Sequence, residues 1–142
     1  MKIVIARPPL WKEIDAEFHV AGQPVIFAWD DTIYNPEDAD ISLDLMAHEK
    51  VHGWRQRGEP TIWWRRYIAD PNFRLAEEIP AHRAEYQAFC RRNIDRNARA
   101  RFLNAVAGRL CSPLYGKMIS MSGARDAILH KPTTLALSLG QG

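Results

Sequence analysis

The stretch that decides the fold is residues 43–57, which read LDLMAHEKVHGWRQR. Its apolar spacing predicts a helix, on which His48 and His52 lie four residues apart on one face. Two imidazoles at that spacing can hold one Zn²⁺ at about 2.0–2.1 Å. Glu49 projects roughly 100° around the helix from His48, where it can take a proton from a zinc-bound water. We therefore expect this helix to carry a zinc site, with Glu49 as the general base.

A third protein ligand is expected from residues 77–86, EEIPAHRAEY. Glu78, His82 and Glu85 fall at positions i, i+4 and i+7, which is one face of a helix. Glu78 is the preferred ligand, because the 26 residues that separate it from His52 leave room for a loop and an antiparallel helix. The alternatives are Glu77, His82 and Glu85.

Pro80 leaves the course of this second helix open. Proline lacks an N–H and disfavours helical geometry at the residue before it, Ile79. Either the helix kinks at Pro80 or it begins there. A helix that begins at Pro80 would leave Glu78 outside it and would favour His82 or Glu85 as the ligand.

With these residues the sequence resembles the gluzincin branch of the zincin metallopeptidases, in which HExxH is followed by a glutamate on a second helix. That glutamate often stands in an ExxA motif, which here is Glu78-Ile79-Pro80-Ala81. The sequence also resembles small, uncharacterised zincin-like proteins encoded by phages and prophages. The resemblance rests on residues 48–56, 63–86 and 111–120, roughly half of the chain.

The resemblance implies a zinc-dependent metallohydrolase, and above all a peptidase. In such an enzyme His48, His52 and Glu78 would bind Zn²⁺, and Glu49 would activate a zinc-bound water to attack a peptide carbonyl of a peptide or protein substrate. Enzymes of this kind usually place a Tyr or His near the third ligand to stabilise the oxyanion. His82 and Tyr86 are the candidates here, with Tyr67 as a more distant alternative.

The remaining elements predict an α+β fold. Residues 25–29 and 32–34 are β-rich runs that predict a hairpin, and residues 2–7 predict a short strand. This small N-terminal sheet should pack against the HExxH helix, because zincins place an edge strand beside that helix. We expect one zincin-like domain over residues 1–130 and a flexible tail over 131–142. Further helices are expected at 10–18, 61–69, 73–92, 95–110 and 123–130.

The composition excludes several classes of protein. The 142 residues are 46% hydrophobic and 25% charged, which is typical of one globular domain rather than a disordered chain. No apolar run approaches the ~18 residues of a membrane-spanning helix, and no signal peptide follows Met1. The sequence therefore predicts a cytoplasmic protein, in the bacterial host cell if it is phage-encoded. Cys90 and Cys111 lack metal-site spacing and predict free thiols.

Charge is distributed unevenly along the chain. Residues 1–49 hold 10 acidic and 3 basic residues, whereas residues 50–142 hold 7 acidic and 16 basic ones. The run of five Arg over 91–101 and the aromatic–basic run over 63–67 would suit nucleic acid. The alternative function is a non-enzymatic accessory protein on a zincin-like fold that binds nucleic acid or a protein partner. The preferred interpretation is that the Arg side chains face solvent and the aromatic rings pack over the HExxH helix.

Overall fold

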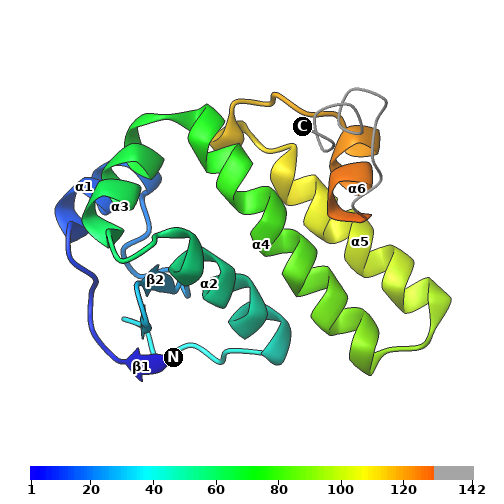
Figure 1. Cartoon of the computed structure of the whole chain (residues 1–142), viewed down its shortest axis with the longest axis horizontal. Helices are drawn as coiled ribbons and strands as arrows, with labels where there is room; N and C mark the ends of the chain where they lie inside the picture. The colour runs from blue at the N-terminus through cyan, green and yellow to red at the C-terminus, as the bar shows by residue number, and fades with distance from the viewer. Residues whose placement is uncertain (130–142) are drawn as a thin grey trace.

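Helix α4 (Pro71–Arg92) runs through the middle of the protein, and the other elements pack on its two sides (Figure 1). The computed structural model describes residues 1–129, so the expected tail lies outside the described residues. Helix α2 (Leu43–Arg55) packs along one side of α4. Helices α5 (Arg96–Leu110) and α6 (Met121–Leu129) pack along the other.

Two hydrophobic cores flank α4. The first lies beside α5 and α6 and consists of small and aliphatic residues around one tyrosine. The second is aromatic and joins α1 (Trp11–Phe18) and α3 (Pro60–Ala69) to the sheet. The buried members of the first core are Val106, Ala107, Leu110, Tyr115, Ala124 and Ile128. Those of the second are Ile14, Phe27, Trp63, Trp64 and Tyr67.

The sheet has three strands in the order β1-β3-β2. Strand β2 (Phe27–Trp29) forms an antiparallel hairpin with β3 (Thr32–Tyr34), and β1 (Lys2–Val4) pairs with β3 in parallel. The expected α+β class and the hairpin are confirmed. Strand β1 is shorter than the expected 2–7, because β3 ends at Tyr34, the partner of Val4. The resemblance to zincins stays a prediction.

Strand β2 lies at the edge of the sheet, and α2 covers that edge. The carbonyl of Ala28 accepts hydrogen bonds from Gln56 Nε2 at 2.9 Å and Trp64 Nε1 at 2.8 Å. The turn after β2 touches the helix at Gly53, where a Cβ would lie 2.4 Å from the carbonyl oxygen of Asp30. Only glycine allows this approach, so residue 53 fixes the distance between the hairpin and α2.

Local capping explains where α2 and α4 begin. Ser42 caps α2, its Oγ accepting from the N–H of Leu45 at 3.1 Å. Asp70 caps α4 by accepting from the N–H of Asn72 at 2.9 Å, with Pro71 at the first helical position. These two residues start α4 earlier than the expected residue 73.

Pro80 lies inside α4 and does not end it. The missing N–H costs the helix one hydrogen bond, to the carbonyl of Ala76. The helix continues because it is packed on both sides, against α2 and against α5 and α6. Glu78 therefore belongs to the same helix as His82 and Glu85, and the alternative of a helix that begins at Pro80 is wrong.

Candidate metal centre

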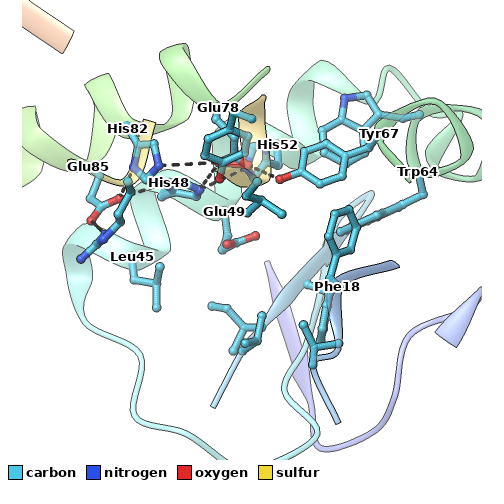
Figure 2. A pocket seen from close by; sticks show the side chains of 18 of the residues that line it. Phe18, Leu45, His48, Glu49, His52, Trp64, Tyr67, Glu78, His82 and Glu85 are labelled. Atoms are coloured by element: carbon cyan, nitrogen blue, oxygen red, sulfur yellow. Dashed lines mark hydrogen bonds and ion pairs between the residues drawn. The ribbon is translucent and has the colours of Figure 1, made fainter. Parts of the chain in front are cut away.

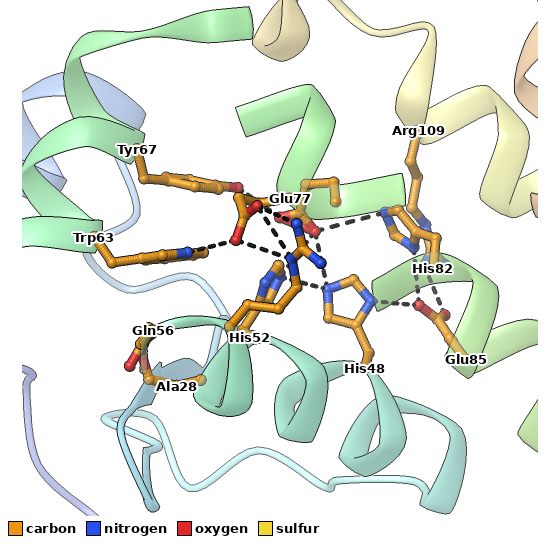
Figure 3. A network of polar contacts seen from close by, with 12 residues as sticks. Ala28, His48, His52, Gln56, Trp63, Tyr67, Glu77, His82, Glu85 and Arg109 are labelled. Atoms are coloured by element: carbon orange, nitrogen blue, oxygen red, sulfur yellow. Dashed lines mark hydrogen bonds and ion pairs between the residues drawn. The ribbon is translucent and has the colours of Figure 1, made fainter. Parts of the chain in front are cut away.

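Two histidines of α2 and one glutamate of α4 converge where the helices face each other (Figures 2 and 3). The Nε2 atoms of His48 and His52 are 3.1 Å apart. Each of them is 3.0 Å from Oε1 of Glu78. All three side chains are buried. The expected set of ligands is therefore brought together at one point.

These three atoms fit a tetrahedral metal ion. With bonds of about 2.0–2.1 Å, tetrahedral zinc ligands lie ~3.3 Å apart, so the three atoms need to separate by only a few tenths of an ångström. Histidine nitrogen and carboxylate oxygen are also ligands that zinc accepts. The group His48, His52 and Glu78 can thus hold a metal ion. Its geometry leaves the identity of the metal open.

A second buried group, His48, His82 and Glu85, could also hold a metal. Hydrogen bonding accounts for its geometry. Oε1 of Glu85 lies 2.9 Å from Nδ1 of His48 and 3.0 Å from Nδ1 of His82, and Arg109 donates to Oε2 at 3.1 Å. Although burial would raise the pKa of Glu85, the hydrogen bonds from both imidazoles lower it, so the carboxylate accepts from both N–H groups. We assign Glu85 as the outer partner that orients His48, an arrangement common around metal-bound histidine.

Tyr67 orients the carboxylate of Glu78 through the oxygen that faces away from the histidines. The hydroxyl of Tyr67 donates to Oε2 of Glu78 at 2.7 Å, which directs Oε1 toward the two imidazoles. Burial, Glu78 and Tyr115 together raise the pKa of Tyr67 well above its usual value, so its hydroxyl stays protonated. Burial opposes ionisation of Glu78, but His52 and His48 hold its pKa well below the usual range. Glu78 is therefore ionised and could serve as an anionic ligand.

His48 carries the proton that a metal would replace. Burial favours its neutral form, but the carboxylates of Glu78 and Glu85 outweigh burial and raise its pKa to about 10. In the metal-free protein His48 is thus an imidazolium that donates Nδ1–H to Glu85 and Nε2–H to Glu78. The Nε2 proton and a metal ion compete for the same lone pair. Among the described buried side-chain atoms, Nδ1 of His52 is the one that has no hydrogen-bond partner.

Glu49 points into the cavity beside these ligands (Figure 2). Its side chain is buried, and the backbone N–H of Ala28 on β2 favours its ionised form. Burial raises its pKa, and the nearby His48 and His52 offset part of that rise. A carboxylate whose pKa is raised toward neutral pH is suited to accept and then release a proton.

The cavity has a volume of about 520 Å³ and is mostly apolar away from the ligands. In Figure 2 the rings of Phe18, Trp64 and Tyr67 lie at one end, and His82 and Glu85 at the other. Val25 and Ile26, which precede β2, line the cavity wall together with Leu114 and Tyr115. Within residues 1–129, Arg109 is the one cationic side chain other than the histidines that lines it.

Two expected site residues lie elsewhere. Glu77 turns away from the histidines, because neighbouring helical positions point about 100° apart. Its carboxylate accepts from Trp63 Nε1 at 2.7 Å and from Arg55 Nη2 at 2.7 Å (Figure 3). Tyr86 packs against the core beside α5 and α6 and does not line the cavity. The structure therefore does not support Glu77 as a ligand or Tyr86 as a catalytic residue.

His82 does line the cavity, with an orientation that sequence could not give. Its Nδ1–H is directed at Glu85, and its Nε2 lies 3.9 Å from Oε1 of Glu78. Burial lowers its pKa, which favours the neutral ring. A neutral ring protonated at Nδ1 presents a lone pair, not a proton, at Nε2. This hydrogen bonding does not favour His82 as an oxyanion donor.

Sequence reasoning missed Arg109 and Tyr115, which reach the site from α5 and from the 3-10 turn Pro113–Tyr115. Neither residue stands in a motif or at a helical spacing from the HExxH segment. The one available signal was the resemblance over residues 111–120, which includes Tyr115. Their roles depend on long-range packing.

The aromatic rings and two of the five Arg side chains that suggested nucleic acid make contacts within the protein. Trp63, Trp64 and Tyr67 are buried in the aromatic core, so they offer no exposed stacking surface. Arg92 pairs with Asp44, and Arg99 donates to backbone carbonyls at the end of α4. The expected packing of these rings over the HExxH helix is confirmed by the contact of His52 with Trp63, whose ring centroids are 5.3 Å apart.

In comparisons with known proteins, no family model, no curated protein and no solved structure matches the chain. None of the helices in residues 1–129 combines the length and hydropathy that a bilayer span requires.

Proposed function

We propose that the protein is a metal-dependent hydrolase, with zinc as the metal and a peptide as the substrate. The observation that carries the proposal is the triangle of His48 Nε2, His52 Nε2 and Glu78 Oε1, with sides of 3.0–3.1 Å, beside the buried carboxylate of Glu49. Three protein ligands leave a fourth position, as catalytic zinc sites require. The arrangement of α2 against edge strand β2 supports the same reading.

A bound divalent ion would supply Lewis acidity toward water and toward a substrate carbonyl. The chain supplies the remaining chemistry. Glu49 takes a proton from the attacking water and passes it to the leaving nitrogen, and its raised pKa suits both transfers. The N–H of Ala28 favours the ionised form of Glu49, which is the form that accepts the proton. Glu85 and Tyr67 hold His48 and Glu78 in their orientations.

The cavity wall favours a peptide over a phosphate ester. Among the described residues its one cationic side chain other than histidine is Arg109. Arg109 is already bonded to Glu85, so it offers little to a phosphate. Ala28 directs its backbone groups away from β3, toward α2 and α3. Ile26, two residues earlier, should share this direction by the period of a strand. No described residue hydrogen-bonds its main chain. An extended substrate could pair there.

Zinc analysis and a cleavage assay test the proposal together. We expect about one zinc per chain after reconstitution, and loss of zinc in His48→Ala. Wild type should cleave an unfolded generic protein, and Glu49→Gln should lower the rate by about 10²–10⁴-fold while keeping zinc. Glu13→Gln, on the exposed side of α1, is the matched control and should cleave at the wild-type rate. Absence of zinc binding, or cleavage that survives Glu49→Gln, would refute the proposal.

A further inference from the structure

The outer surface where α2 and α4 lie side by side is unusually apolar. Trp54 is 73% exposed and Leu43 is 66% exposed, although both are large hydrophobic residues. The other four tryptophans lie in or against the aromatic core. A shallow groove runs between the two helices, lined by Leu43, Met46, Ala47, Lys50, Val51, Trp54, Ala84, Gln87, Ala88, Arg91 and Arg92.

The groove has the dimensions of a short helix. Leu43, Ala47, Lys50 and Trp54 follow one another at helical spacing along α2, so the stripe is ~16 Å long at 1.5 Å per residue. This length equals about three helical turns. The floor between the large end residues is formed by small side chains of both helices, which would let another helix approach closely.

The groove is also cationic. Lys50, Arg91 and Arg92 line it, and none of the carboxylates in the described part of the chain does. Asp44 pairs with Arg92, but within residues 1–129 no carboxylate forms an ion pair with Lys50 or Arg91. A ligand that complements this surface needs an apolar stripe flanked by negative charge.

We propose that this groove binds an acidic amphipathic helix of about three turns from a partner protein. Trp54 would be the main anchor, since exposed tryptophans that become buried at interfaces dominate binding energy. Two such grooves facing each other would bring like charges together, so a symmetric second copy fits less well. Nucleic acid also fits less well, because most of the lining is apolar. The site is independent of the metal centre, which lies on the opposite face of α2.

Selection from a random library of 16-residue peptides tests the proposal without knowledge of the partner. The immobilised protein selects binders, and the Trp54→Ser variant removes those that bind elsewhere. We expect enriched peptides to carry apolar residues at i, i+3 or i+4, and i+7, with net negative charge. Their affinity should fall at least about tenfold in Trp54→Ser and in Lys50→Glu. It should be unchanged in Ile62→Ser, a matched control that removes a 62% exposed residue of α3.

Several outcomes would overturn the proposal. One is a selection that yields no peptide dependent on Trp54, or a consensus that is neutral or basic. Another is self-association in sedimentation experiments that Trp54→Ser abolishes, which would make a second copy the occupant. A third is binding of a DNA or RNA oligonucleotide that depends on Trp54 and not on Ile62. Circular dichroism should show that Trp54→Ser and Lys50→Glu keep the wild-type fold.

Discussion

Helix α2 has two faces, and they differ in the reverse sense from an ordinary surface helix. A typical amphipathic helix buries its apolar side and exposes its polar side. The buried residues of α2 are instead Asp44, His48, Glu49, His52 and Gly53. Its most exposed residues include Leu43 and Trp54. Composition alone does not reveal this inversion, because both kinds of residue are common in helices.

The two faces of α2 also differ in whether their side chains have partners. Burying a polar group costs free energy unless it is hydrogen-bonded, and burying a charge costs more. On the inner face partners from α4 and β2 meet this cost, as Glu78, Glu85 and Ala28 show. On the outer face exposed apolar area remains without a described partner. This contrast agrees with the two proposals, a metal site on the inner face and a docking surface on the outer face.

The largest expected effect is a loss of zinc affinity, and it should follow substitution on the inner face of α2 but not on the outer face. His52→Ala removes an inner-face ligand, and we expect zinc affinity to fall by more than the 10–100-fold that loss of an outer-shell partner typically costs. Trp54→Ser, two residues along the same helix but on the outer face, should change it less than about twofold. Competition with a chelator of known affinity measures both. Equal losses in the two variants would mean that α2 responds as a unit and would remove the distinction.

Glu85 and Glu77 sharpen the comparison within α4. Both are buried glutamates of that helix, but Glu85 bonds His48, whereas Glu77 bonds Arg55 and Trp63. Glu85→Gln should weaken zinc binding by about 10–100-fold, because it removes the charge that orients His48. Glu77→Gln makes the same chemical change away from the histidines and should leave zinc affinity within about twofold.

Calorimetric titration of zinc into both proteins makes this measurement. If Glu77→Gln weakened zinc as much as Glu85→Gln, the effect would reflect a loss of buried charge in general. Our assignment of Glu85 as the partner of His48 would then be wrong.

The pH dependence of zinc binding tests the proton on His48. Its pKa is raised to about 10 in the metal-free protein, so this ring is protonated between pH 6 and 8. Zinc must displace that proton, and its affinity should rise by about tenfold per pH unit in this range. Glu78 stays ionised there because its pKa is lowered, so it contributes no opposing slope. Zinc affinities at three pH values give the slope, and a flat profile would show that His48 is already neutral.

Much of the inner face was predictable from sequence, because it depends on local spacing. The HExxH helix, the hairpin, and the shared face of Glu78, His82 and Glu85 follow from periods of 3.6 and 2. The direction in which individual side chains point was harder to predict from the sequence. Periodicity places Glu77 and Tyr86 about 80–100° to either side of Glu78 but does not say which neighbour each will meet. The continuation of α4 through Pro80 depends on packing from both sides. Arg109 and Tyr115 enter through long-range contacts that leave no local pattern.

The smallest expected effect concerns the outer face. Leu43→Ser and Trp54→Ser remove side chains that are 66% and 73% exposed, so little buried area is lost. We expect each to change the free energy of unfolding by at most about 0.5 kcal/mol, as surface substitutions usually do. Ile14→Ala, at a fully buried position of the aromatic core, should cost about 2–5 kcal/mol. Urea denaturation compares the three. A cost above about 1 kcal/mol for Trp54→Ser would mean that this residue supports the fold itself, and a partner would no longer be needed to explain its position.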